Sequence, residues 1–185
     1  MTDDVMTDDG MRHGGTGAGG LDDTGADRGA DVVVQRGLYL DELRVGTRYV
    51  HSPARTVTET DNVFFTTLTG NTQSLHLDEE WSRGTEFGGR LVNSMFTLAL
   101  VVGLSVSQLT QGTIVANLGF EEVQFPAPVR VGDTVTAETV VRSVRPSRSR
   151  PAQGVAVLEH TGRNQRGEVV VVAVRSALMH VAPAP

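Results

Sequence analysis

One long apolar segment, residues 91–109, restricts the possible folds of this chain more than any other feature. Its apolar residues fall on nearly every face of a helix, a pattern that predicts a buried helix rather than an amphipathic surface helix. Thr97, Gly103 and Ser105 interrupt the segment, and it is too short to span a membrane. We therefore expect a buried helix at the centre of a globular domain. The apolar residues are Leu91, Val92, Met95, Phe96, Leu98, Ala99, Leu100, Val101, Val102, Leu104 and Val106.

Runs with strand character flank this segment on both sides. Predicted strands cover residues 48–58, 113–125, 133–145, 154–164 and 168–181. Between the first two strands, Thr58 or Thr60 caps a short helix that ends at Gly70. A polar loop follows, and then a second short helix over residues 78–83. One buried helix with one strand before it and four after it predicts an α+β fold, in which an antiparallel β-sheet wraps around the helix.

The first part of the chain differs in composition from the rest. Residues 1–31 are rich in Gly, Asp and Thr, and their few apolar side chains cannot offset the entropy lost on ordering. Eight aspartates and two arginines there give a charge of −6, which equals the formal charge of the whole chain. We expect residues 1–36 to be a disordered tail, either dispensable or an acidic arm, and residues 37–182 to be one folded domain of neutral net charge.

The composition also excludes several kinds of chemistry. The chain has no cysteine, and all 16 of its basic Lys and Arg residues are arginine, so thiolate, iron–sulfur and Schiff-base sites are excluded. No pair of histidines has the spacing of metal ligands, and we expect neither a metal nor another cofactor. A neutral folded region argues against nucleic acid as a partner. The chain begins without a basic, apolar leader, so we expect a cytoplasmic location and no membrane partner.

Candidate catalytic residues lie in the polar loop, at the start of the second short helix and at the start of the long helix. The polar loop contains Asn71 and His76, followed by Asp78 at the start of the second short helix. Imidazole ordinarily titrates near pH 6.5, so a histidine can both take and give a proton near neutrality. Backbone N–H groups at the start of the long helix, around Asn93 and Ser94, can stabilise a developing negative charge.

The order of these elements resembles the MaoC-like enoyl-thioester hydratases, which have the hotdog fold. The resemblance rests on a Gly-x-x-x-x-Leu-His-x-Asp core at residues 70–78, Phe-Gly-Gly-Arg at residues 87–90, Phe-Pro at residues 125–126 and Val-Gly-Asp at residues 131–133. It covers residues 38–180. It implies that His76 is the catalytic histidine and that the hotdog sheet surrounds the long helix.

The resemblance places Asn71 where the family carries a catalytic aspartate. A carboxylate accepts a proton from water at neutral pH, whereas a neutral amide only holds and orients the water. We expect His76 to perform both proton transfers while Asn71 positions the water. Alternatively, Asp78 or Asp61 replaces the missing base, although Asp78 is also a typical helix cap.

Substrate-binding residues are also implied. The family has a His-Gly pair at the start of its long helix, and here Asn93 and Ser94 retain the backbone donors. Arg148 and Arg150 lie in an arginine-rich turn between two predicted strands. Their guanidinium groups either clamp the phosphates of coenzyme A or belong to a solvated loop.

The resemblance implies a hydro-lyase that interconverts a trans-2-enoyl thioester and its 3-hydroxyacyl thioester. The branch with Leu-Val-Asn-Ser at the helix start indicates a short, branched or dicarboxylic acyl-CoA, and an acyl-carrier-protein thioester is the alternative carrier. Hotdog sheets commonly pair, so we expect a homodimer or a higher homo-oligomer. Two other functions remain open: an acyl-thioester thioesterase, and a non-catalytic acyl-thioester binder whose site has decayed.

Overall fold

The computed structural model describes residue 31 and residues 33–184, and its compact unit begins at Gln35. Most of the tail expected over residues 1–36 therefore lies outside the described residues. Arg36 is part of the compact unit, because its guanidinium pairs with the Glu42 carboxylate at 2.6 and 2.8 Å and stacks on Tyr39.

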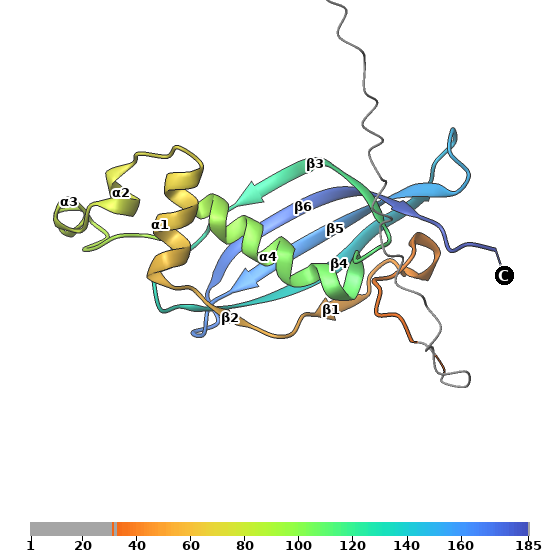
Figure 1. Cartoon of the computed structure of the whole chain (residues 1–185), viewed down its shortest axis with the longest axis horizontal. Coiled ribbons are helices and arrows are strands. Elements are labelled where there is room, and N and C mark those ends of the chain that lie inside the picture. The colour runs from red at the N-terminus through yellow and green to blue at the C-terminus, as the bar shows by residue number, and fades with distance from the viewer. Residues whose placement is uncertain (1–30, 32, 185) are drawn as a thin grey trace, which may run out of the picture. The chain divides into compact units, whose positions relative to one another are not determined.

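The described residues form one antiparallel sheet with a long helix on it and three short helices at one end (Figure 1). A 3-10 turn at Leu40–Glu42 precedes them. The helices are α1 (Glu59–Leu68), α2 (Ser74–Leu77), α3 (Glu79–Arg83) and α4 (Ser94–Leu109). The strands are β1 (Arg48–Val50), β2 (Arg55–Thr56), β3 (Ile114–Gln124), β4 (Thr134–Pro146), β5 (Gln153–Arg163) and β6 (Val169–His180).

The sheet has the strand order β1-β4-β5-β6-β3, and β2 also pairs with β4. Strands β3 to β6 confirm the four predicted strands after the helix, each within one residue at both ends. Within the described residues β3 pairs only with β6, so its other edge is open. The sheet is the antiparallel one that the sequence predicts.

The first predicted strand, residues 48–58, is instead divided into β1 and β2. Both segments pair with β4, Arg48 opposite Val140 and Arg55 opposite Val135. Pro53 lies between them and has no backbone N–H to donate to the ladder, which accounts for the interruption.

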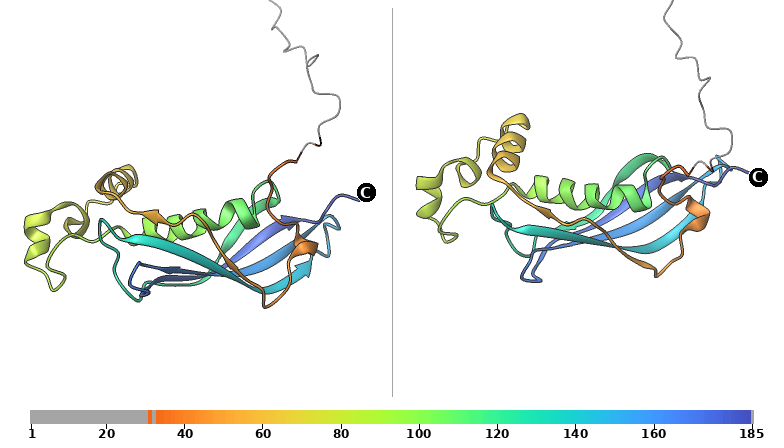
Figure 2. Two further views of the ribbon diagram at one scale, coloured as in Figure 1. Left: turned by 90° about the horizontal axis from the view of Figure 1, so that it is seen from below. Right: turned by 60° about the horizontal axis from the view of Figure 1, so that its bottom comes forward.

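Helix α4 lies along one face of the sheet (Figure 2). It begins three residues later than predicted, because Leu91 and Val92 lie outside the helix and donate their N–H groups to the carbonyls of Leu75 and Val129. Asn93 is the N-cap, and its side-chain oxygen accepts the Met95 N–H at 3.0 Å. These bonds tie the beginning of α4 to α2 and to the loop before β4.

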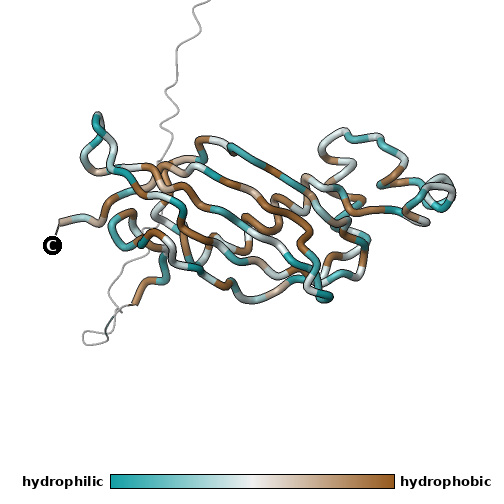
Figure 3. The backbone as a smooth tube through the Cα atoms, turned by 180° about the vertical axis from the view of Figure 1, so that it is seen from behind, coloured by the Kyte–Doolittle hydropathy of each residue, from teal (hydrophilic) through white to brown (hydrophobic). Residues whose placement is uncertain are grey.

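Two clusters of buried side chains pack α4 against the sheet. One surrounds Phe96 and Val101, and the other surrounds Leu109, Leu158 and Met179. Apolar stretches run along the strands, while the β4–β5 turn is hydrophilic (Figure 3). A Cβ added to Gly162 of β5 would lie 2.5 Å from Cγ2 of Val101, so the absence of a side chain there lets α4 approach the sheet closely.

One stripe of α4 is exposed, contrary to the expectation of a helix buried on nearly every face. Met95, Ala99 and Gly103 follow one another at helical spacing and are open to solvent, with Met95 54% exposed. Together with Phe65 and Phe120 they line a shallow apolar groove between α4 and β3. The described residues leave this side of the central helix uncovered.

Helices α1 to α3 form the segment that carries the polar residues. Thr58 and Asp61 make a capping box at the start of α1, and Gly70 follows the helix with a φ of 67°. Asp78 caps α3 through the Trp81 N–H at 2.9 Å. The predicted polar loop between them contains a helical turn, α2, and it is this turn that carries His76.

Candidate active site

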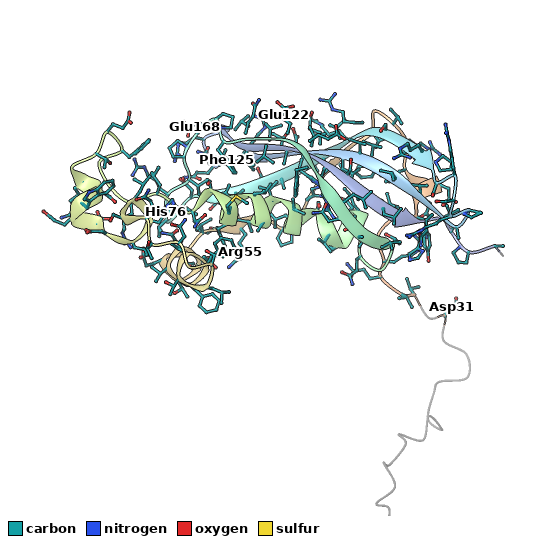
Figure 4. All side chains as sticks on the ribbon, turned by 90° about the horizontal axis from the view of Figure 1, so that it is seen from above. Asp31, Arg55, His76, Glu122, Phe125 and Glu168 are labelled. Atoms are coloured by element: carbon teal, nitrogen blue, oxygen red, sulfur yellow. The ribbon has the colours of Figure 1, made fainter. Side chains whose placement is uncertain are left out.

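A cavity of about 490 Å³ lies between α2, the beginning of α4 and the loop that joins β3 to β4. Figure 4 shows His76 and Phe125 near the same end of α4. Most of the wall is apolar, and the polar groups come from Gln73, His76, Ser94 and Thr97. The lining residues are Gln73, Leu75, His76, Phe87, Leu91, Val92, Ser94, Thr97, Phe125, Pro126, Ala127, Pro128, Val129 and Val170.

His76 presents one ring nitrogen to this cavity. Its Nδ1 lies 3.0 Å from the carbonyl oxygen of Leu91. A carbonyl only accepts hydrogen bonds, so Nδ1 must donate, and in the neutral ring Nε2 then carries the lone pair. Nε2 has no hydrogen-bond partner among the described residues. The tautomer that the fold selects is therefore the one in which Nε2 can accept a proton from a molecule in the cavity.

The beginning of α4 supplies one backbone donor to the cavity. The N–H of Asn93 is taken by the side-chain oxygen of Asn62 at 3.0 Å, and the N–H of Met95 is taken by the Asn93 side chain. The N–H of Ser94 makes no hydrogen bond in the described part of the chain, and Ser94 lines the cavity. Of the two residues predicted to provide backbone donors, Ser94 is the one that remains available.

Asn71 is not among the residues that line the cavity. Its side-chain oxygen accepts the Gln73 N–H at 2.9 Å, and its own N–H donates to the Thr66 carbonyl at 3.0 Å. The side chain thus forms an Asx turn that shapes the entry to α2. Gln73 lines the cavity instead, and its carboxamide has no hydrogen-bond partner among the described residues.

Asp78 and the two arginines also lie away from the cavity lining. Asp78 is exposed at the start of α3, where its carboxylate accepts the Trp81 N–H. Arg148 and Arg150 lie in the turn between β4 and β5, at the opposite end of the sheet from α2 (Figure 1). Arg150 donates to the Gln153 side chain at 3.4 Å. Within one chain the structure does not bring these residues to His76.

The cavity lining contains no aspartate, glutamate, arginine or lysine. His76 is its one titratable side chain. Proton transfer by groups of the lining must therefore pass through a single imidazole, with amide and hydroxyl groups available only to orient a ligand.

Ion pairs fix the wall that carries Phe87. Arg90 donates to Glu59 of α1 at 2.6 Å and to Glu79 of α3 at 3.0 Å. The hydrogen bonds to Glu59 and Glu79 raise the pKa of the Arg90 guanidinium. Arg130, beyond the cavity, donates to the Phe87 carbonyl. The segment before α4 is thereby held against α1 and α3.

Two buried polar residues of α1 were not predicted from the sequence. Asn62 and Thr66 are fully buried, and both contact Asn93. Asn62 also donates to the backbone carbonyl of His76 at 3.0 Å. Their spacing of four residues, which puts two polar side chains on one helix face, is the signal that could have identified them.

Two other histidines of the described region, His51 and His160, are hydrogen-bonded inside the fold. His51 Nδ1 lies 2.8 Å from the Gln108 side-chain oxygen, and His51 Nε2 lies 2.7 Å from Thr139 Oγ1. The same hydroxyl lies 2.8 Å from His160 Nδ1. Burial lowers the pKa of His51 and, with the nearby Arg175 charge, lowers the pKa of His160 to about 3. Both therefore remain neutral at physiological pH.

Neither a metal site nor a membrane span is found in the region that the structure covers. Between residue 31 and residue 184, leaving out residue 32, no three His, Asp or Glu side chains are grouped as metal ligands. None of the helices described there is long and apolar enough to cross a bilayer.

Comparison with known proteins identifies the family. The profile of the MaoC like domain matches residues 42–173. The chain belongs to this family. It is 30% identical over 153 residues to the mesaconyl-CoA hydratase of Cereibacter sphaeroides, a match that covers 80% of this chain and 44% of the relative. It is also 30% identical over 111 residues to the (R)-specific enoyl-CoA hydratase of Rhodospirillum rubrum, covering 60% of this chain and 74% of that protein.

Solved structures agree with this assignment and confirm the hotdog fold. The MaoC-like dehydratase of Rhodospirillum rubrum superposes with a TM-score of 0.71 at 31% identity, covering 80% of this chain and all of that one. A double-hotdog protein of Mycobacterium tuberculosis superposes with a TM-score of 0.70 at 24% identity, covering 80% of this chain and 46% of that one. The chain spans less than half the length of the first curated relatives that it matches, at 44%, 43% and 37%.

Proposed function

We propose that the protein is a hydratase that adds water across the α,β double bond of an enoyl thioester, and that also catalyses the reverse dehydration. The observation that carries this proposal is that one cavity is lined both by His76, whose Nε2 carries a lone pair, and by Ser94, whose N–H has no partner among the described residues. Membership of the MaoC like domain family supports it, as do relatives named as hydratases and dehydratases.

In the proposed reaction His76 acts first as base and then as acid. Nε2 removes a proton from water while the water oxygen bonds to Cβ, and the electrons of the double bond move to the thioester oxygen. The Ser94 N–H donates to this oxygen, which carries negative charge in the enolate. The imidazolium then returns its proton to Cα, so water has been added and the histidine is neutral again.

A short, branched or dicarboxylic acyl group is the proposed substrate, carried by coenzyme A or by an acyl-carrier protein. Relatives named mesaconyl-CoA hydratase and beta-methylmalyl-CoA dehydratase support this class. The cavity lining supports it too, because it contains no carboxylate that would repel a negatively charged acyl group. A cytoplasmic location is proposed on the sequence alone.

A thioesterase is the second candidate, because one base and one N–H donor also suit attack of water on a thioester carbonyl. Incubation of the full chain with crotonyl-CoA and mesaconyl-CoA separates the two functions. Loss of the conjugated enoyl absorbance without free thiol is the expected result. Release of thiol would instead establish hydrolysis, and saturable binding with neither change would establish a non-catalytic binder.

We also propose that two copies of this chain pair through β3 and the exposed stripe of α4. The open edge of β3 and the apolar groove beside Met95, Gly103 and Phe120 support a second copy there. The double-hotdog neighbour, of which this chain matches 46%, supports an assembly of two hotdog units. Sedimentation of the full chain should give twice the monomer mass, and Gly103→Arg should shift it to the monomer mass.

A further inference from the structure

We infer that Asn62 is the positioning residue of this site: its carboxamide fixes the catalytic imidazole and the oxyanion donor relative to one another. The inference rests on the proposed function, in which His76 and Ser94 act on the same bound thioester. Asn62 does not line the cavity. It acts through the backbone of the two segments that do.

Asn62 joins these segments with both ends of one amide group. Its Nδ2 donates to the carbonyl of His76 at 3.0 Å, and its Oδ1 accepts the N–H of Asn93 at 3.0 Å. The residue is fully buried, so water does not compete for either bond. His76 lies 14 positions after Asn62 and Asn93 lies 31 positions after it. One side chain on α1 therefore connects α2 to the beginning of α4.

The same bonds decide which backbone donor the cavity receives. Because Asn62 takes the N–H of Asn93, that group is not available to a substrate. The Asn93 side chain takes the N–H of Met95, and its own Nδ2 donates to Thr66 Oγ1 at 3.3 Å. The Ser94 N–H lies between these two occupied donors. The helix end thus offers a substrate oxygen one donor at a fixed place.

The direct contacts between the two segments do not involve the N-cap of α4. His76 Nδ1 donates to the Leu91 carbonyl, and the Leu91 N–H donates to the Leu75 carbonyl. Both bonds lie in the part of the chain just before α4, whereas Asn62 bonds to the N-cap residue Asn93 itself, beside the Asn93–Thr66 bond. Without Asn62 the buried N–H of Asn93 and the His76 carbonyl would each lack a partner, and the segment would shift to find one.

The first test replaces Asn62 with leucine, which has a similar size but makes neither hydrogen bond. We expect kcat of Asn62→Leu for enoyl-CoA hydration to fall by about 10²-fold, because small misplacements of reacting groups have effects of this order. KM should change by less than about threefold, because the lining residues are retained. A folded Asn62→Leu protein whose kcat stays within about threefold of wild type would overturn the inference.

Asn164 offers a matched control. It is also a buried asparagine, and its side chain holds the β5–β6 turn through Glu168 and the Arg166 N–H. It does not line the cavity. Asn164→Leu should lower the melting temperature as Asn62→Leu does, while kcat remains near the wild-type value. An equal fall of kcat in both variants would mean that general destabilisation, not positioning, explains the effect.

Asn62→Asp is the second variant, and it tests the positioning role of Asn62 even if the leucine variant does not fold. A protonated carboxyl at this position accepts from Asn93 and donates to the His76 carbonyl, whereas an ionised one leaves two oxygens facing each other. Burial raises the pKa of such a carboxyl. The ratio of variant kcat to wild-type kcat should therefore rise as the pH is lowered from about 8.5 to about 5.5. A ratio that is near one at both pH values would contradict the inference.

A measurement that needs no turnover separates this inference from the proposed function. In the wild type the His76 Nδ1 proton, held by Leu91, should give a slowly exchanging imidazole resonance in the NMR spectrum. Asn62→Leu should remove it and Asn164→Leu should keep it. If no enoyl thioester is hydrated but this pattern is found, the proposed reaction fails and the positioning role stands. If the resonance persists in Asn62→Leu, the positioning role fails, whatever the activity.

Discussion

Two regions of this molecule contain hydrogen-bonded histidines, and they differ in what the second ring nitrogen meets. At the end of α4, His76 is held through Nδ1 by the Leu91 carbonyl, and Nε2 faces a cavity. In the interior of the domain, His51 and His160 are joined through the Thr139 hydroxyl, and His160 is completely buried. A fixed tautomer is common to both regions. Access for a ligand, and not hydrogen bonding, separates a reactive histidine from a structural one.

The interior histidines also show how a hydrogen-bond chain fixes protonation. The Gln108 side-chain oxygen accepts from His51 Nδ1, so His51 Nε2 accepts the Thr139 hydroxyl proton. The hydroxyl oxygen must then accept from His160 Nδ1, and His160 Nε2 carries a lone pair. That atom is buried without a partner, as is one terminal nitrogen of Arg175. Both rings make these hydrogen bonds in the neutral form, in agreement with the low pKa of His160.

Removing the cavity histidine should give the largest effect. We expect His76→Ala to lower kcat/KM for enoyl-CoA hydration by about 10³-fold, the usual contribution of a general acid–base group. Steady-state assays of the wild type and the variant measure this ratio. His180→Ala, which removes a histidine of β6 outside the cavity lining, serves as the control and should retain the wild-type rate. Equal rates for the wild type and His76→Ala would remove the functional contrast between the two regions.

Lowering the pH should destabilise the fold through the interior histidines. We expect this effect to be smaller than the effect of His76→Ala on activity. The pKa of His160 is about 3 in the folded protein and ordinarily about 6.5 when exposed, so the unfolded chain binds the proton more readily between these values. The contribution of neutral His160 to the free energy of unfolding is fully present well above about pH 6.5, and it falls as the pH decreases through this window. The loss from His160 alone should be about 2 kcal/mol between pH 6.5 and pH 5.

Urea unfolding at these two pH values measures this loss. His160→Gln removes the titrating ring and should reduce the pH dependence by that amount, while His51 keeps a part of it. If the wild type and His160→Gln lose the same free energy of unfolding, the interior histidine is not held neutral by burial.

The smallest effect is expected at Asn71. Aspartate retains the acceptor for the Gln73 N–H, and position 71 does not line the cavity. We therefore expect kcat of Asn71→Asp to stay within about threefold of wild type, because the new carboxylate does not reach the reacting atoms. A rate increase of about tenfold or more would show that position 71 does take part in proton transfer.

Much of the fold could be predicted because it depends on local patterns. Strands β3 to β6 are bounded by Gly and Pro turns, and the long, mostly apolar run marks α4. The helix start was misplaced because Leu91 and Val92 are as apolar as the helix itself. Their N–H groups bond to the carbonyls of Leu75 and Val129 instead of joining the helix, which no local pattern reveals.

The site was only partly predictable for the same reason. The His76 position follows from its surrounding residues, and Ser94 follows from the helix start. The occupation of the Asn93 N–H by Asn62 depends on residues 31 positions apart in the chain. Asn71 looked like a substitute for a carboxylate because of its place in the sequence, but its side chain turns back to the Gln73 backbone.

A cavity with a single titratable side chain has a consequence for reversibility. On the proposed mechanism, hydration begins when neutral His76 takes a proton from water, and dehydration begins when the same neutral ring takes a proton from Cα. Both directions therefore start from one ionisation state of the enzyme, and a change of acidity slows them equally. The pH dependence of the hydration rate and that of the dehydration rate should therefore have the same shape.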